Sequence, residues 1–217
     1  MAPKLYGDAR SPCVRAVLLT VKALNIDVEY VKMDLGKKEH LTDEYLKLNP
    51  RHTVPTLEDN GFVVWDSHAI MIYLASKYGK NNPIYPDDEQ KRAVINQMLF
   101  FETGDIFSAH RHISYPIIYK GVKQTPVICT EELEKGYKYL DELLALSKFV
   151  AGDEMTIADF SIWTTLYNSQ IWIPLDAGKY PNLGRWCAIL NKLPYKNLNM
   201  EGSEEFMSFM KDFLKKQ

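Results

Sequence analysis

The spacing of apolar residues predicts alternating strands and helices in the first part of the chain. Short apolar runs at residues 4–6 and 28–32 have the length and composition of strands. Between these runs, apolar residues follow the i, i+3, i+4, i+7 spacing of one helix face at Val14, Val17, Leu18 and Val21. A second patterned segment, residues 40–50, predicts a helix that Asn49-Pro50 ends.

The next residues predict a hairpin followed by a helix. VPTLE and FVVWD flank the tripeptide DNG, whose Asn60-Gly61 pair favours a type I′ turn. The segment SHAIMIYLASKYG then predicts a helix that begins with Ser67 as its N-cap and stops at Gly79. Residues 1–80 therefore read as a compact βαβαββα domain.

A change of pattern follows at residues 80–89, KNNPIYPDDE, which contain two prolines and no periodicity. We interpret residues 81–88 as a linker. Residues 89–217 lack convincing period-2 alternation and predict an all-helical domain. Within it, Thr156 and Asp159 have the spacing of a capping box at a helix start. The predicted fold class is α/β plus all-α.

Composition narrows the function classes. Hydrophobic residues make up 46% of the 217 residues, ample for a sizeable core, and the formal charge of −2 provides no basic surplus for nucleic acid or an anionic membrane. The N-terminus has no apolar signal region, and no window of about 18 apolar residues occurs. Cys13, Cys129 and Cys187 are odd in number and lack CxxC spacing, which argues against a disulfide framework. We expect a cytoplasmic protein.

Several common catalytic motifs are missing from the sequence. GxGxxG, GxxxxGK, HExxH and GxSxG do not occur. His110 and His112 sit two apart on a predicted helix and point to different faces, which is poor geometry for a shared metal ion. We therefore expect no metal.

The stretch RSPCVR at residues 10–15 brings two candidate nucleophiles to one helix start. Ser11 before Pro12 is a typical N-cap with proline at the first helical position. The same hydroxyl, at a helix N-terminus directly after a strand, also suits an anionic ligand. Cys13 lies inside the helix and is better explained as a small buried hydrophobe.

Two further segments allow either a structural or a binding role. In NPRHTVP, Pro55 precedes a strand, and a cis Val54-Pro55 bond would expose the Val54 backbone to a peptide-like ligand; a plain turn is the alternative. Asp66-Ser67 can simply cap a helix, or Ser67 and the free N–H groups can hold a ligand carboxylate while Asp66 accepts its ammonium.

Aromatic residues gather around Arg111 in the helical part, among them Phe107, Tyr115 and Tyr119. Such a run forms core or dimer contacts more often than a substrate pocket. A charge among apolar neighbours usually has a partner or an anionic ligand, although a solvated helix face is the alternative.

Taken together, these motifs closely resemble those of the cytosolic glutathione transferases, specifically the insect epsilon class, with the delta class next. The resemblance covers essentially the whole chain and rests on LYGDARSPCVRA, LNPRHTVPTLEDNG, DSHAIMIYL, FFETGDIF and FVAGDEMTIADFS. It implies a thioredoxin-like domain followed by an all-helical domain, a homodimer, and glutathione as co-substrate in the detoxification of hydrophobic electrophiles.

The resemblance also implies roles for particular residues. Ser11 corresponds to the catalytic serine of the serine-type classes. Glutathione contacts are expected at His40, His52, Thr53, Val54, Pro55, Asp66, Ser67, His68 and Arg111. A hydrophobic substrate pocket is expected at Phe107, His110, Tyr115, Ile118 and Tyr119.

Two departures from the family pattern concern these expectations. Many relatives carry Glu where this chain has Asp66, and Pro116 should kink the helix lining the pocket. Three other functions stay open: a non-catalytic carrier of glutathione or hydrophobic ligands, a glutathione-dependent peroxidase or dehydrochlorinase, and a redox enzyme that uses Cys13.

Overall fold

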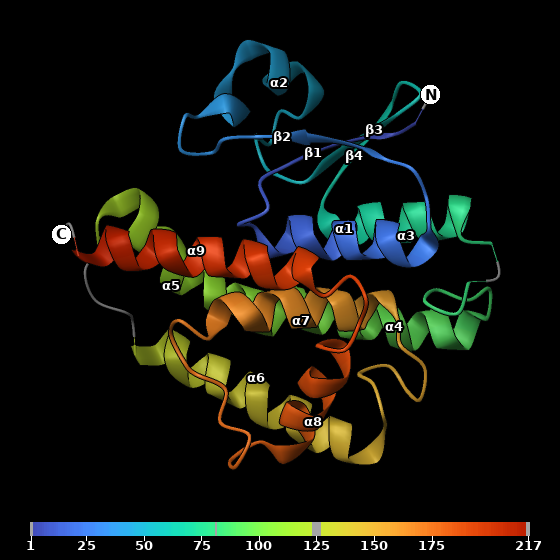
Figure 1. The fold of residues 1–217 in the computed structure, drawn as a ribbon, viewed down its shortest axis with the longest axis vertical. Helices are drawn as coiled ribbons and strands as arrows, with labels where there is room; N and C mark the ends of the chain where they lie inside the picture. Colours follow the sequence, from blue (N-terminus) through green and yellow to red (C-terminus); the bar gives the residue numbers. More distant parts are fainter. Residues whose placement is uncertain (1, 81, 123–126, 216–217) are drawn as a thin grey trace.

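The computed structural model describes residues 2–80, 82–122 and 127–215. In its N-terminal part, β1 (Lys4–Gly7), β2 (Glu29–Lys32), β3 (Thr56–Asp59) and β4 (Phe62–Trp65) form a sheet of order β2-β1-β3-β4 (Figure 1). Strand β1 pairs in parallel with β2 and antiparallel with β3, which pairs antiparallel with β4. The parallel β1–β2 pair is joined by a helix, as the βαβ interpretation requires.

The helices of this part are α1 (Pro12–Leu24), α2 (Asp43–Leu48) and α3 (Ser67–Tyr78), with a short 3₁₀ turn η1 (Glu39–Leu41) before α2. The order βαβαββα is confirmed. Figure 1 shows α1 and α3 between the sheet and the helical part, while α2 lies at the far side. Helices α1 and α3 therefore pack against the second half of the chain, α1 on α7 and α9 and α3 on α7.

The predicted hairpin turn joins β3 to β4. Asn60 and Gly61 have φ values of 51° and 85°. Positive φ at both central residues is the requirement of a type I′ turn, which explains why the sequence Asn-Gly predicts it. The prediction of a hairpin is confirmed.

The connection between the two parts is packed. The predicted linker starts at residue 81, which lies outside the described residues. Beyond it, Ile84 and Tyr85 are buried, and the Ile157 N–H donates to the Ile84 carbonyl at 3.0 Å. Asp88 then caps the next helix by accepting from the Lys91 N–H. This segment is ordered by packing against the start of α7 rather than suspended between the parts.

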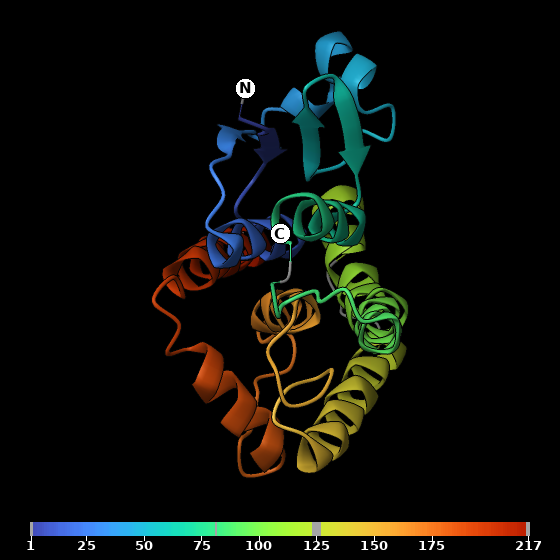
Figure 2. The same ribbon diagram turned by 90° about the vertical axis from the view of Figure 1, so that its right-hand side faces the viewer.

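The helical part contains α4 (Glu89–Phe101), the π-helical segment η2 (Glu102–Ile106), α5 (Phe107–Lys120), α6 (Val127–Leu146), α7 (Ile157–Ser169), α8 (Pro181–Leu190) and α9 (Asn197–Lys215). Figure 2 shows α7 at the centre, surrounded by the other helices. Every residue of α7 except Tyr167 is buried. Helices that are apolar all round belong in a core, and α7 is the core of this part.

The start of α7 is fixed by the predicted Thr156–Asp159 pair. The Asp159 carboxylate accepts from the Thr156 N–H at 2.8 Å, from the Val150 N–H at 3.1 Å and from Trp186 Nε1 at 2.8 Å. Burial raises the pKa of Asp159 to about 6, against the lowering effect of these donors. One buried side chain thus ties α7 to α8 and to the loop before it.

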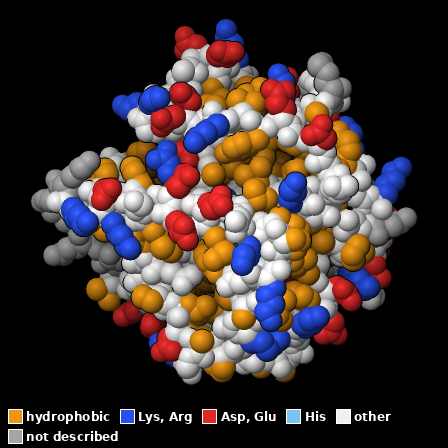
Figure 3. Space-filling view, in the orientation of Figure 1, with side chains coloured by type: hydrophobic (Ala, Val, Ile, Leu, Met, Phe, Trp, Pro, Cys, Tyr) orange, Lys and Arg blue, Asp and Glu red, His pale blue; other side chains and the backbone are white. Residues whose placement is uncertain are grey.

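The surface in Figure 3 carries lysine and arginine side chains interspersed with aspartate and glutamate rather than separated by sign. Hydrophobic side chains lie between them. Within the described residues, no helix combines the length and apolarity needed to cross a bilayer.

Candidate functional site

Ser11 lies at the N-terminus of α1, directly after the loop that follows β1. Its backbone is extended, with φ −74° and ψ 126°, and its N–H donates to the Asp8 carbonyl at 2.9 Å. Pro12 follows at the first helical position, as predicted. Among the described residues, the Ser11 hydroxyl forms no capping hydrogen bond with the helix backbone. The position of an N-cap is confirmed, but the hydroxyl is not used for capping.

Cys13 is the second residue of α1 and is half-buried. Burial raises the pKa of Cys13 to about 12, and the charge of Glu102 adds to the rise. Hydrogen bonding to Ser67 and Ser11 acts in the opposite direction and lowers this pKa. The Cys13 thiol is therefore protonated at neutral pH.

Asp66, not Ser67, is the N-cap of α3. The expectation of a Ser67 cap is wrong because Asp66 Oδ1 accepts from the His68 and Ala69 N–H groups at 3.0 and 3.2 Å. Asp66 holds a φ of 79°, and Ser67 is the first helical residue, 6% exposed. Asp66 Oδ2 accepts no hydrogen bond from the described residues. One carboxylate oxygen stays available beside a helix N-terminus.

A buried polar network holds the loop before β3. The Tyr45 hydroxyl donates to the Thr53 carbonyl at 2.6 Å, and Asn49 Nδ2 donates to the same carbonyl at 3.0 Å. Thr56 Oγ1 lies 2.8 Å from the Tyr45 hydroxyl and 2.9 Å from Asn49 Nδ2. The network fixes Thr53 and the residues that follow it.

The Val54-Pro55 peptide bond is cis, which confirms the prediction. Within the described part of the chain, no hydrogen bond reaches the Val54 N–H or C=O. Val54 is half-buried, and Pro55 is buried. A half-buried backbone donor and acceptor on a rigid loop can pair with an extended ligand.

Two histidines lie beside this loop. His40 is 8% exposed, and its Nδ1 is buried without a hydrogen-bond partner among the described residues. Burial lowers the pKa of His40, and nearby His52 lowers it further. The two ring centroids are 6.4 Å apart, and His52 is exposed with a φ of 47°. An orphaned buried ring nitrogen indicates a missing partner, such as a ligand group.

His68 points away from these groups and into the contact between the two parts. Its Nε2 lies 2.7 Å from Ser161 Oγ and 3.2 Å from Glu102 Oε2, while its Nδ1 lies 3.2 Å from Thr103 Oγ1. Glu102 is 3% exposed, and its other oxygen accepts from the Thr165 hydroxyl at 2.5 Å. His68 thus connects α3 to η2 and α7.

Sequence reasoning missed Glu102, Ser161 and Thr165 as part of this cluster. Ser161 and Thr165 look like ordinary residues of an apolar helix. Only Glu102, an acidic residue that becomes buried, could have been noticed in the sequence as a candidate. Glu102 opens η2, and single π-helical turns inside longer helices are frequent at functional sites. Its charge is close enough to raise the pKa of Cys13.

The residues expected to line a hydrophobic pocket divide between two faces of α5. Arg111 and Tyr115 are exposed, with the guanidinium 5.0 Å from the ring centroid of Tyr115. The ring of exposed Tyr119 lies tilted against that of Tyr115, with the two centroids 4.3 Å apart. Phe107 and Ile118 are half-buried. Pro116 lies inside this helix, which continues to Lys120.

His110 lies on the inward face instead. It is 3% exposed, its Nδ1 lies 3.1 Å from Ser169 Oγ, and its ring is 5.7 Å from that of Phe206. Burial lowers the pKa of His110 to about 3, with a contribution from the charge of Arg15. The structure places His110 in the core between α5, α7 and α9, so it does not join the exposed residues of α5.

A cavity of about 440 Å³ lies between the loop after β1, the end of β2 and α9. It is lined by Asp8, Arg10, Lys32, Met33, Asp34, Glu205, Ser208, Phe209 and Asp212. Burial raises the pKa of Tyr119, and the charges of Tyr115 and Asp8 raise it further.

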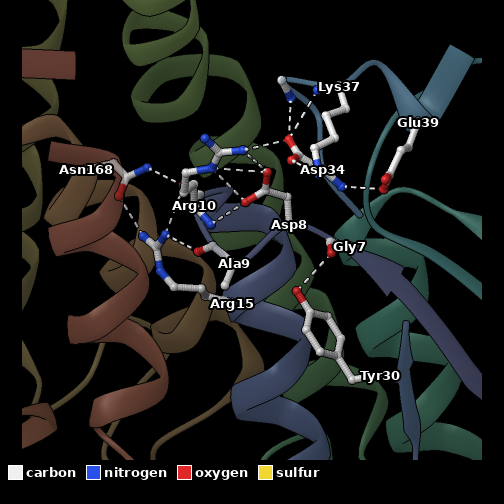
Figure 4. Close-up of polar contacts among 11 residues, drawn as sticks. Gly7, Asp8, Ala9, Arg10, Arg15, Tyr30, Asp34, Lys37, Glu39 and Asn168 are labelled. Carbon is white, nitrogen blue, oxygen red and sulfur yellow. Dashed lines mark hydrogen bonds and ion pairs between the residues drawn. The ribbon is translucent and has the colours of Figure 1, made fainter. Parts of the chain in front are cut away.

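Arg10 is held in place at this cavity (Figure 4). Its Nε and Nη2 donate to the Asp8 carboxylate at 3.0 and 2.5 Å, and Asp34 lies 3.9 Å from Nη2. The guanidinium lies 5.3 Å from the Phe209 ring centroid. Sequence reasoning missed Arg10 and Phe209 because their proximity depends on how α9 crosses the N-terminal part.

No metal centre accompanies these groups. In residues 2–80, 82–122 and 127–215, no three His, Cys, Asp or Glu side chains are arranged to hold a metal ion. Hydrogen-bonding capacity stays unused at Asp66 Oδ2, the Val54 backbone and His40 Nδ1 within the described residues, and the Ser11 and Ser67 hydroxyls lie at the starts of α1 and α3.

Comparison with known proteins gives the family. Residues 1–76 match the glutathione S-transferase N-terminal domain, and residues 97–188 match the glutathione S-transferase C-terminal domain. Glutathione S-transferase 1 of Manduca sexta is 40% identical over 207 residues, which cover 94% of this chain and 95% of that protein.

Solved structures that resemble this chain point to the same family. An epsilon-class glutathione S-transferase from the housefly, Musca domestica, is 44% identical with a TM-score of 0.94, covering 97% of this chain and 98% of the other. A glutathione transferase homologue from Drosophila mojavensis, solved with bound glutathione, is 40% identical with a TM-score of 0.94 and 97% coverage of both chains. The chain therefore belongs to the glutathione S-transferase family.

Proposed function

We propose that this protein conjugates the glutathione thiolate to hydrophobic electrophiles, and that the Ser11 hydroxyl stabilises the thiolate. The observation that carries the proposal is the Ser11 hydroxyl itself. It stands at the N-terminus of α1 and is not used as a cap within the described residues. Asp66 Oδ2, the Val54 backbone and His40 Nδ1 supply further unused hydrogen-bonding groups that a tripeptide could use.

Glutathione fits these groups end to end. The γ-glutamyl carboxylate would bind at the N-terminus of α3 and Ser67, while Asp66 Oδ2 would accept from its ammonium. The cysteinyl backbone would pair with the free Val54 N–H and C=O, as an added strand pairs with a sheet edge. His40 and His52 would face the glycine end. Among the remaining expected contacts, Thr53 and Pro55 shape the loop, and His68 acts through Glu102 and Ser161.

The energy required of Ser11 is modest. A free thiol with a pKa of about 8.5 is only about 3% thiolate at pH 7, and each unit of lowering corresponds to about 1.4 kcal/mol. One hydrogen bond to the sulfur anion contributes about 1.5 to 3 kcal/mol, and the helix N-terminus about 0.3 to 1 kcal/mol. Together they lower the thiol pKa by about one to three units without a general base.

A redox role for Cys13 is disfavoured by its surroundings. The thiolate is the reactive form, and the pKa of Cys13 is raised to about 12 by burial and by Glu102. On this account Cys13→Ala retains conjugating activity within about 2-fold, because a thiol of such pKa supplies almost no thiolate at pH 7. Loss of activity in Cys13→Ala would favour the redox reading.

The second substrate would bind where the exposed face of α5 meets the cavity at Arg10 and Phe209. The Tyr115–Tyr119 pair and Phe209 provide aromatic surface there. Phe107, Arg111 and Ile118 belong to the same helix, with Arg111 near the bound thiol or the electrophile.

We also propose that the protein functions as a homodimer through the side that carries β4 and α4. Figure 2 shows these elements on one side of the molecule. Large apolar side chains are exposed there, with Phe100 76%, Val94 43% and Trp65 42% exposed. Large apolar side chains exposed on one side of a protein are typical of an interface. Light scattering of the purified protein and of Phe100→Glu tests this: a dimer that the substitution converts to monomer is the predicted result.

The test of catalysis compares wild type with Ser11→Ala in the conjugation of glutathione to a generic aromatic electrophile. We expect a large loss of turnover in Ser11→Ala with retained glutathione affinity. If neither protein turns over while both bind glutathione, the carrier function replaces the transferase function.

A further inference from the structure

Arg15 is a buried cation with an unusual set of partners. It lies one turn beyond Ser11 on α1 and is 0% exposed. Its three guanidinium nitrogens donate to five neutral oxygens: Asn199 Oδ1 at 3.0 Å, the Ala9 carbonyl at 2.9 Å, the Arg10 carbonyl at 3.0 Å, the Thr164 carbonyl at 3.1 Å and Asn168 Oδ1 at 2.7 Å. Within the described residues, no carboxylate is hydrogen-bonded to it.

Stability does not explain this arrangement. A buried charge without a counter-ion is unfavourable, and apolar residues of similar volume often stabilise a core by comparison. Burial lowers the pKa of Arg15 to about 9, which still leaves it protonated at neutral pH. The titratable groups whose charges interact with it are Cys13, Asp8 and His110. A buried cation held only by neutral oxygens calls for a role other than stability.

The partners of Arg15 show what it holds. Two of them are the carbonyls of Ala9 and Arg10, the residues directly before Ser11 (Figure 4). Asn168 joins the same loop by donating from Nδ2 to the Arg10 carbonyl at 3.0 Å. The loop is therefore fastened to α7 and α9, which belong to the other half of the chain.

The close approach of α9 supports the same conclusion. A Cβ atom on Gly202 would lie 2.3 Å from the Ala9 carbonyl oxygen and 2.7 Å from Arg15 Cδ. The absence of a side chain at Gly202 thus lets the loop and Arg15 sit directly against α9. The loop has little freedom to move relative to the helical part.

We propose that Arg15 is a positioning residue for Ser11: by holding the Ala9 and Arg10 carbonyls against α7 and α9, it sets the direction of the Ser11 hydroxyl toward the thiol. Geometry matters here because a hydrogen bond weakens steeply when its donor turns away from the acceptor. This inference rests on the proposed function and assigns Arg15 no contact with glutathione.

The test measures the pKa of the enzyme-bound thiol and the steady-state constants in Arg15→Lys and Asn168→Ala. Lysine keeps the charge but has one donor nitrogen in place of three and cannot span the loop, α7 and α9. We expect the bound-thiol pKa to rise by about half a unit or more and kcat per folded protein to fall about 5-fold or more, with the glutathione KM within about 3-fold. Asn168→Ala should also raise the bound-thiol pKa and lower kcat, each by less than Arg15→Lys does.

Leu183→Ala is the matched control, because Leu183 is fully buried in α8, a helix that packs against α6. It should lower stability without changing the thiol pKa. If Arg15→Lys does not fold, the bound-thiol pKa of Asn168→Ala alone tests the proposal. An unchanged thiol pKa in the folded variants, with Ser11→Ala still shifted, overturns the role of Arg15 only. An unshifted Ser11→Ala overturns the proposed function instead.

Discussion

At the scale of single residues, Asp66 shows how one side chain serves structure and ligand together. Its Oδ1 caps α3, while Oδ2 has no partner among the described residues. The sequence DS pointed to the right place but to the wrong cap, because Asp and Ser are equally good N-caps and only the backbone decides between them. A φ of 79° at Asp66 is not readable from local sequence.

Substituting Asp66 by asparagine separates the two roles. Asparagine caps as well as aspartate, so the melting temperature should stay nearly constant. The charge that would meet the γ-glutamyl ammonium is lost, and the glutathione KM should rise about 10-fold, in line with about 1.5 kcal/mol for a charged hydrogen bond. Asp66→Ala is the control, since it should lower both stability and affinity. An unchanged KM in Asp66→Asn would remove Asp66 from the site.

At the scale of elements, local signals predicted the elements themselves well and their contacts poorly. Asn60-Gly61, Ser11-Pro12 and Thr156–Asp159 each marked a turn or a helix start, because these motifs act over two to four residues. The η2 segment and the burial of His110 were not predicted, since both depend on how α4 and α5 pack on α7.

The contact between α9 and the loop before Ser11 gives a prediction about Gly202. Gly202→Ala places a methyl group against the Ala9 carbonyl oxygen, so the loop or the helix must shift. We expect a melting temperature lower by several degrees, reflecting about 1 to 3 kcal/mol of overpacking, together with reduced kcat. Gly104→Ala is the comparison, because a Cβ there meets nothing within 4 Å. Equal behaviour of the two variants would contradict the close approach.

The end of β3 gives a second prediction at this scale. Burial by itself would raise the pKa of Asp59, but hydrogen bonds from Lys77, Tyr78 and Tyr73 outweigh it and lower the pKa to about 2. A carboxyl group with a lowered pKa stabilises the folded state at pH values above its unfolded pKa of about 3.9. This stabilisation is lost as the pH falls toward 2. Asp59→Asn should therefore lower stability at pH 6 and flatten its dependence on pH below about 4, measured by urea unfolding. A wild-type slope in the variant would rule this out.

At the scale of the whole molecule, buried polar residues join the two halves. Arg15 and His68 both link the N-terminal part to α7, and His110 joins α5, α7 and α9 inside the helical part. Sequence patterns predicted an α/β region and an all-helical region, because the periodicity of each segment depends only on the secondary structure of that segment. They could not predict which polar side chains meet across the contact, since these residues are hundreds of ångströms of extended chain apart, at about 3.4 Å per residue.

His110 contributes to the pH dependence of overall stability. Its pKa is about 3 in the folded protein, so the unfolded chain, with a pKa of about 6.5, binds more protons between these values. The contribution of this residue to stability should fall as pH drops below about 6.5, by at most about 1.4 kcal/mol per pH unit. Asp159, whose pKa is raised to about 6, acts in the opposite direction between about pH 6 and 4. His110→Gln should reduce that slope between pH 6 and 4. An unchanged slope would show that His110 is not buried in its neutral form.

The most direct test of the central claim is the pKa of the glutathione thiol on the enzyme, followed by thiolate absorbance in wild type and Ser11→Ala. In wild type we predict a value about two units below the 8.5 of a free thiol. In Ser11→Ala it should rise by about one unit or more while the glutathione Kd stays nearly the same, because only the hydrogen bond to the sulfur is removed. The same thiol pKa in both proteins would contradict the role of Ser11.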